Sequence, residues 1–205
     1  MLAWTIYISF IGVLVLMLLP KGNASLARGT ALLFAVLGLI AGIVGISQYK
    51  DSVAVAGSGK IMSVANCDWI PSLGIHYHLA ADGISLTLVL LTGLAAVAGI
   101  LFSWNIEHRT KEFFAFYLAL IGGVYGVFLS FDLFLLFVFY EIAIVPKYFI
   151  IAIWGSTRRE YGAMKLALYS FIGSAMVLVG LIAAYVVSGA HSFDVAELAK
   201  YSYPH

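Results

Sequence analysis

Six apolar runs divide this chain, and their lengths constrain its fold more than any other feature. Each is close to the roughly 20 residues that a helix needs to cross a bilayer. The runs occupy residues 2–19, 29–47, 84–104, 113–131, 133–154 and 162–187. Because unpaired backbone groups are costly in lipid, such runs form helices. The sequence therefore predicts an all-α polytopic membrane protein with about six transmembrane helices.

Composition agrees with this class and excludes others. The chain is 63% hydrophobic and 10% charged, outside the range of soluble domains. A net charge of +1 creates no field that would attract nucleic acid or an acidic substrate. Cys67 is the only cysteine, so an intrachain disulfide and a thiolate-rich metal site are excluded. Residues 2–19 lack the basic start and cleavage pattern of a signal peptide, so we expect a retained helix.

The basic residues of the connections predict the orientation. Connections one, three and five carry Lys21, Arg28, Arg109, Lys111, Arg158 and Arg159, and the opposite side carries Lys50, Lys60 and Lys200. The positive-inside rule then places both termini outside. We expect two N-terminal helices in 1–47, an extracytoplasmic loop or hairpin in 48–83, four helices in 84–187 and a polar surface tail in 188–205. That tail contains a short amphipathic stretch suited to the membrane surface.

The long connection 48–83 has its own pattern. Gly57-Ser-Gly59, Pro71 and Gly74 punctuate alternating residues, which predicts a short hairpin over the helix ends. His76 and His78 share one face of a strand and, with Asp82, are candidate metal ligands. Their spacing lacks the fuller ligand set of metal sites, so a structural role is favoured and no metal is predicted.

Side chains at helix starts and glycines inside helices have structural interpretations. Asp82 and Asp132 precede the third and fifth helices, where a carboxylate caps free amides. Thr157 with Glu160 fits a capping box for the sixth helix. The glycines at four-residue spacing permit close helix packing, and they are Gly38 with Gly42 and Gly122 with Gly126.

Glu141 is the residue that most demands a functional explanation. It lies near the middle of the fifth apolar run, where an ionised carboxyl costs at least about 2.5 kcal/mol. Apolar neighbours disfavour its charged form unless a cation or water offsets the burial. A carboxyl poised between two charge states can take up and release a proton, so we interpret Glu141 as a proton-relay acid. The alternative is a static ion pair that fixes helix packing.

Three further residues are placed on the possible proton path or beside it. Pro146 cannot donate to the carbonyl of Ile142, so a kink and a hydratable carbonyl are expected just beyond Glu141. Lys147 is about 9 Å along the axis and about 120° around from Glu141, so a packing role is favoured over a relay role. Lys165 is an entry group for protons or a plain interface anchor. The sequence contains no nucleophile-base pair, phosphate-binding glycine loop, haem-ligand pair or iron-sulfur spacing, which predicts no catalysis by this chain alone and no cofactor in it.

Four segments together carry a family resemblance. They are Tyr77 to Ser85 (YHLAADGIS), Tyr140 to Pro146 (YEIAIVP), Tyr148 to Gly155 (YFIIAIWG) and Lys165 to Ser174 (KLALYSFIGS). As a set they resemble antiporter-like subunit M, of chain 4 type, in proton-pumping NADH:quinone oxidoreductase, which is respiratory complex I. The match runs through essentially the whole chain and is shared with the paralogous subunits of multi-subunit sodium/proton antiporters.

The resemblance implies a role, partners and a location. The glutamate that matches Glu141 is a key acid of the family's proton path, and complex I couples quinone reduction by NADH to proton export. The resemblance thus implies a non-redox subunit among other membrane-arm subunits, embedded in the lipid bilayer, most simply the bacterial cytoplasmic membrane. A cation/proton antiporter subunit and a non-conducting structural module remain the alternatives.

Two departures qualify the resemblance. Family members have about fourteen spanning helices, and a lysine on a broken helix after the sixth pairs with the glutamate. This chain stops before such a helix, so it resembles the N-terminal part of a longer subunit. Lys147 also stands where an apolar residue is expected.

Overall fold

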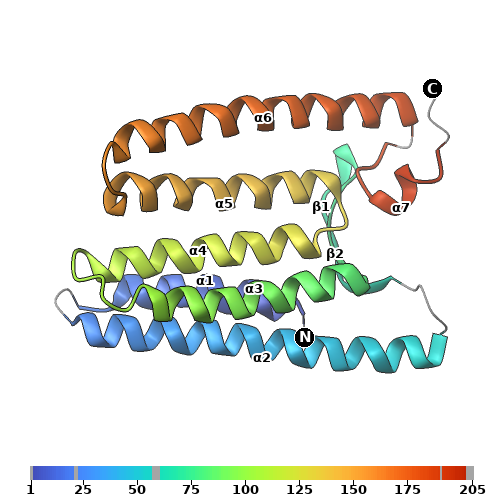
Figure 1. Cartoon of the computed structure of the whole chain (residues 1–205). Coiled ribbons are helices and arrows are strands. Elements are labelled where there is room, and N and C mark those ends of the chain that lie inside the picture. Colours follow the sequence, from blue (N-terminus) through green and yellow to red (C-terminus); the bar gives the residue numbers. More distant parts are fainter. Residues whose placement is uncertain (1, 21–22, 57–60, 190, 202–205) are drawn as a thin grey trace.

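The computed structural model describes residues 2–20, 23–56, 61–189 and 191–201. Long helices lie side by side, and a hairpin with a short helix closes one end of the bundle (Figure 1). The elements are α1 (Ala3–Leu18), α2 (Ala24–Ala56), β1 (Met62–Ile70), the 3-10 turn η1 (Pro71–Leu73), β2 (Ile75–Ala81), α3 (Gly83–Phe102), α4 (Thr110–Leu129), α5 (Leu133–Trp154), α6 (Arg159–Ser188) and α7 (Val195–Leu198).

The helices confirm the predicted all-helical membrane class. Five of them, α2 to α6, are long and apolar enough to cross a membrane, and α1 is a shorter apolar helix of 16 residues. The number of six spans and the sides of the termini stay predictions.

The predicted end of the second helix is wrong. α2 does not stop at residue 47 but continues to Ala56, so residues 48–56 of the expected loop are helical. The charges in this segment lower its hydropathy, but it contains neither glycine nor proline, and polar residues alone do not end a helix. Gly57-Ser-Gly59 lies outside the described residues.

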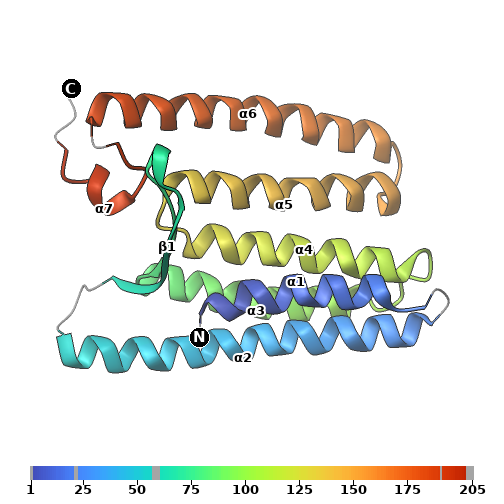
Figure 2. The same ribbon diagram turned by 180° about the vertical axis from the view of Figure 1, so that it is seen from behind.

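α4 is the centre of the bundle. It packs against α1, α2, α3 and α5, while α6 covers the outer side of α5 (Figure 2). Of the most apolar part of α4, 56% is buried inside the chain, against 6% for α6. The predicted glycine packing is confirmed on α4, where a Cβ at Gly122 would approach Ser9 Cβ of α1 to 3.1 Å. Gly126 lies directly against the ring of Phe139 on α5.

A two-stranded antiparallel hairpin crosses the end of the bundle. β1 pairs with β2 from Met62 opposite Ala81 to Ile70 opposite Ile75, with two irregularities in the register. Gly74 ends the turn with a φ of 63°, a left-handed conformation that glycine adopts without strain. The linker between α4 and α5 continues this pairing, because Phe131 N donates to His78 O at 2.9 Å.

Two of the three predicted helix caps are confirmed. Asp82 accepts from Ser85 N at 2.7 Å, a hydrogen bond that holds the pKa of Asp82 below its usual range. Asp132 accepts from Phe134 N and Leu135 N at 2.9 and 3.0 Å. The capping box at Thr157 is wrong, because α6 starts after Arg158, whose φ of 60° is left-handed and whose side chain makes no cap bond.

The chain after α6 packs against the hairpin end of the bundle instead of forming the expected polar surface tail. Leu133 N donates to Phe193 O, and Val195 N donates to Phe131 O, both at 3.0 Å. Phe193 is buried and stacks on Tyr185 with ring centres 4.7 Å apart. The apolar residues that suggested an amphipathic surface helix thus find partners inside the chain, and the helical part, α7, is only four residues long.

Candidate functional site

Glu141 is the ninth of the 22 residues of α5, about 4 Å from the middle of the helix. Its side chain is half-buried, and its Oε1 is buried with no hydrogen-bond partner among the described residues. A buried carboxyl oxygen without a partner is costly unless a proton or water satisfies it. The environment of Glu141 therefore suits a group that binds a proton.

The packing of α5 on α4 orients this carboxyl. Leu135, Phe139, Ala143 and Pro146 form the buried face of α5, and a Cβ at Gly123 of α4 would come within 3.0 Å of Ala143 N. Glu141 is about 160° around the helix from Phe139. The carboxyl therefore projects away from α4.

Pro146 lies inside α5 and is buried. Its ring nitrogen has no hydrogen, so the carbonyl of Ile142 cannot receive the bond that a regular helix would supply. The side chain of Ile142 is exposed on the flank of α5. An acid and a freed backbone acceptor thus occur one residue apart.

Neither lysine of the predicted path is paired with Glu141. Lys147 is half-buried, and no ion pair joins it to Glu141 within the described part of the chain. Lys165 is exposed, with its ammonium 5.4 Å from the centre of the Tyr161 ring. Ile151 lies against Gly162, which puts Lys147 and Lys165 at nearly the same height on the antiparallel α5 and α6. Both lie about 9 Å from the height of Glu141, toward the end opposite the hairpin.

Two apolar grooves follow the flank of α5 next to Glu141. One, of about 380 Å³, lies between α1, α4 and α5 and reaches from Lys111 to Pro146. The other, of about 510 Å³, runs from the hairpin along α5, and both are lined by Ile142. Tyr77 lines the second groove, where burial and the neighbouring Tyr7 hydroxyl raise the pKa of Tyr77. Both grooves are lined mostly by apolar residues, so they suit acyl chains or apolar side chains better than a proton path.

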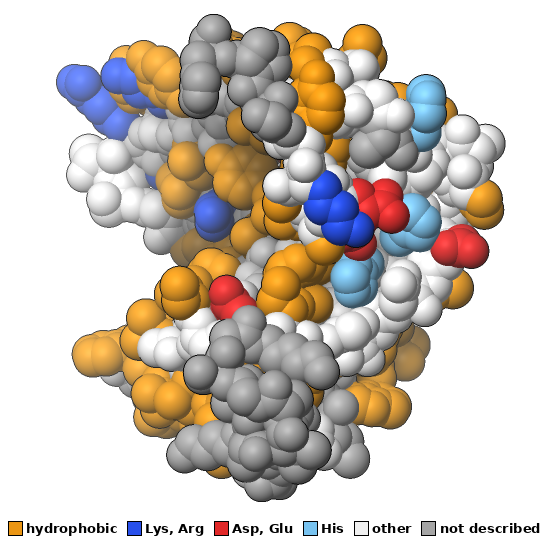
Figure 3. All heavy atoms as spheres, turned by 90° about the vertical axis from the view of Figure 1, so that its right-hand side faces the viewer, with side chains coloured by type: hydrophobic (Ala, Val, Ile, Leu, Met, Phe, Trp, Pro, Cys, Tyr) orange, Lys and Arg blue, Asp and Glu red, His pale blue; other side chains and the backbone are white. Residues whose placement is uncertain are grey.

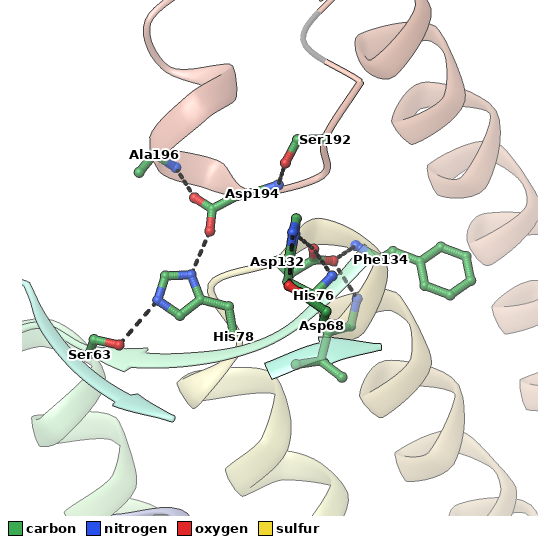
Figure 4. A network of polar contacts seen from close by, with 10 residues as sticks. Ser63, Asp68, His76, His78, Asp132, Phe134, Ser192, Asp194 and Ala196 are labelled. Atoms are coloured by element: carbon green, nitrogen blue, oxygen red, sulfur yellow. Dashed lines mark hydrogen bonds and ion pairs between the residues drawn. The ribbon is translucent and has the colours of Figure 1, made fainter. Parts of the chain in front are cut away.

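A second polar cluster lies at the hairpin end, and Figure 3 shows histidine and acidic side chains gathered there. His78 Nδ1 is 2.5 Å from Asp194 Oδ2, and its Nε2 is 3.4 Å from Ser63 Oγ (Figure 4). His76 Nε2 is 3.6 Å from Asp68 Oδ1, and its Nδ1 is 4.0 Å from Asp132 Oδ2.

This cluster differs from the metal ligand set that the sequence suggested. Asp82 caps α3 instead of joining the two histidines. No group of three or more ligating side chains could hold a metal ion within the described residues. Sequence reasoning missed Asp194 because it is 116 residues from its partner His78, and no local pattern links the two.

The contacts from Ser63 to His78 and from His78 to Asp194 follow the connectivity of a serine-histidine-aspartate triad, which no pattern in the sequence predicts. The serine-histidine contact of 3.4 Å is at the limit for a hydrogen bond. Ser63 is also exposed on the hairpin. These contacts are better explained as links between the hairpin and the segment after α6 than as a nucleophile and its base.

Comparisons with known proteins agree with the fold. Residues 130–204 match the family described as NADH:quinone oxidoreductase/Mrp antiporter, TM. The chain is 44% identical over 136 residues to NAD(P)H-quinone oxidoreductase chain 4 1 of Synechococcus sp. (strain JA-3-3Ab), covering 66% of this chain. It is 37% identical over 212 residues to NADH-quinone oxidoreductase subunit M of Pseudomonas aeruginosa, covering 97% of this chain.

A solved structure shows the same fold. The chain aligns over its full length with one chain of respiratory complex I from Thermus thermophilus with bound NADH, with a TM-score of 0.81 and 22% identity, and covers 40% of that chain. It spans 26% and 42% of the two relatives named above, so less than half of each. The chain belongs to the NADH:quinone oxidoreductase/Mrp antiporter family of transmembrane subunits.

Proposed function

We propose that this chain is part of a proton-translocating membrane subunit of an NADH:quinone oxidoreductase, in which Glu141 takes up and releases a proton inside the membrane. The observation that carries the proposal is the buried, unpartnered Oε1 of Glu141 near the middle of α5. Relatives named as subunits of the oxidoreductase support it. The proposed site is the bacterial cytoplasmic membrane, with other membrane-arm subunits as partners. In this proposal the partner subunits carry out the redox chemistry.

The mechanism rests on the two charge states of one carboxyl. When protonated, Glu141 is neutral and tolerated at this depth, and the proton becomes labile when water or a cation stabilises the carboxylate. The unbonded carbonyl of Ile142 offers one position for such a water. Lys147 and Lys165 lie between Glu141 and the predicted inner end, where a change in their charge would bias the carboxyl over several ångströms. We assign them a supporting role in delivering the proton.

The test is a Glu141→Gln substitution in the assembled oxidoreductase, read as protons pumped per electron. Glutamine keeps the size and hydrogen-bonding capacity of the side chain but carries no titratable proton. We expect quinone reduction to become uncoupled from pumping or to slow with it. The matched control is Glu160→Gln at the exposed start of α6, for which pumping stays normal.

Other outcomes point to other functions. Normal pumping in a normally assembled Glu141→Gln complex overturns the relay. Loss of assembly identifies Glu141 as part of a structural pair. The family description also covers Mrp antiporters, and proton exchange that requires sodium and no quinone would favour the antiporter alternative.

A further inference from the structure

The hairpin end holds titratable side chains that the proposed path through Glu141 does not use. They are Asp68 on β1, His76 and His78 on β2, Asp132 at the start of α5 and Asp194 after α6. Three carboxylates and two neutral imidazoles give the cluster a formal charge of −3, and protonation of both imidazoles lowers it to −1.

The contact between His78 and Asp194 is the shortest and most sheltered of the cluster. Their side chains are only 13% and 14% exposed, so water screens the pair less than it screens a surface ion pair. Asp194 also accepts from Ala196 N at 2.8 Å through its other oxygen. The residue that pairs with the imidazole thus also starts α7.

The histidine joins segments that are remote in the sequence. Phe131 N donates to the backbone oxygen of His78, and Val195 N donates to the backbone oxygen of Phe131. On the other side, Phe193 N donates to Gly74 O at 3.2 Å, and a Cβ at Gly74 would collide with His191 O. These uncharged contacts hold residues 191–195 in register on the hairpin, and the contact between His78 and Asp194 adds to them.

We propose that the His78–Asp194 pair is a pH-responsive clasp that tightens the segment after α6 onto the hairpin as the imidazole becomes protonated. A neutral imidazole donates one hydrogen bond to Asp194, whereas a protonated one adds full charge attraction. The added attachment is present when the imidazole is charged and is lost as pH rises through the range in which histidine gives up its proton. It is also lost in strong acid, when Asp194 takes up a proton.

Several other side chains lie close to the His78–Asp194 pair and bear on its response to pH. His76, whose buried Nδ1 has no hydrogen-bond partner in the described chain, faces Asp68 and Asp132, so its protonation acts between the hairpin and the start of α5 and not on the segment after α6. Phe131 places its ring edge-on to His78, with ring centres 5.7 Å apart, and adds no charge. The other titratable groups of the hairpin, the end of α6 and the segment after it are Cys67, Tyr77, Tyr185, His191, Glu197, Lys200 and Tyr201, and all of them except Tyr77 and Tyr185 are exposed.

The test is hydrogen-deuterium exchange of the backbone amides of Phe193 and Val195 in the assembled complex, at about pH 6 and about pH 8. After correction for the intrinsic pH dependence of exchange, we expect protection of these amides to be about fivefold higher at the lower pH. His78→Gln and Asp194→Asn should abolish this difference, and Asn keeps the oxygen that caps Ala196. His191→Gln, which changes an exposed histidine of the same segment, should leave it intact.

Equal protection at the two pH values in the wild-type complex overturns the clasp, and this measurement needs no variant. A pH difference that persists in both His78→Gln and Asp194→Asn also overturns it. The readout is independent of proton pumping, so the clasp and the relay at Glu141 can fail separately.

Discussion

Asp132 is the single side chain on which the hairpin end depends most. It is fully buried, and its two oxygens accept from three backbone amides, those of Phe134, Leu135 and His76. We predict that Asp132→Ala lowers the free energy of unfolding by about 2–4 kcal/mol, because it leaves these buried donors without acceptors. Thermal unfolding of the purified complex, followed by the retention of this subunit, measures the loss.

Asp82→Ala provides the comparison for that substitution. Asp82 caps α3 through Ser85 N from a more exposed position, so its removal should cost about 1 kcal/mol. Equal losses in the two variants would show that Asp132 acts only as a helix cap and does not hold the hairpin.

At the scale of elements, the contact between α4 and α5 decides where Glu141 points. A Cβ at Gly123 would lie 3.0 Å from the backbone nitrogen of Ala143, which has no freedom to move aside. We predict that Gly123→Ala forces the two helices apart and costs about 1–3 kcal/mol. Gly173→Ala on α6, where a Cβ meets nothing within 4 Å in this chain, should cost nothing. A comparable loss in Gly173→Ala would mean that this face of α6 is covered in the complex.

Helix ends were the least predictable part of the elements. Apolar runs locate every long helix because burial in lipid requires them, but α2 continues beyond its apolar run since no residue there breaks a helix. At α6 the residues fit a capping box, yet the tight turn after Gly155 places Arg158 in a left-handed conformation and starts the helix there. At this turn the connection between α5 and α6, and not the local sequence pattern, determines where α6 begins.

At the scale of the whole molecule, the basic connections gather at the end opposite the hairpin. Lys111 Nζ donates to the carbonyls of Met17 and Leu19, and Arg28 donates to the carbonyl of Ile106. Several of the charges that predict the inner side therefore also bind the carbonyls of helix ends and connections there. The hydrogen bonds fix the connections in place, while the positive-inside rule alone predicts the orientation, with the hairpin outside.

Cys67 makes this orientation testable. It is the only cysteine in the chain and is exposed on β1. We predict that a membrane-impermeant maleimide labels it in right-side-out vesicles and not in inside-out vesicles. Cys67→Ser combined with His108→Cys, an exposed position at the other end, should reverse the pattern. Labelling of the detergent-solubilised complex controls for reactivity, and a reversed result would contradict the assigned sides.

The candidate site was only partly visible in the sequence, for a physical reason. Glu141 stands out because a carboxylate amid apolar residues is costly wherever the helix packs. Its distance from Lys147 also follows from helical geometry alone. The partner of His78 could not be found in the same way, because Asp194 reaches it through a fold in which the segment after α6 crosses back to the hairpin.

The crossing of residues 193–195 over the linker between α4 and α5 has a consequence for synthesis. The pairing joins parts of the chain that are synthesised at different times, because Asp194 follows its partner His78 by 116 residues. We expect the hairpin and α3 to α5 to be in place first, so that residues 193–195 pair with Gly74 and Phe131 only after α6 has been synthesised. Docking of this segment is thus the last step of folding at that end, and it reports that α6 is in place.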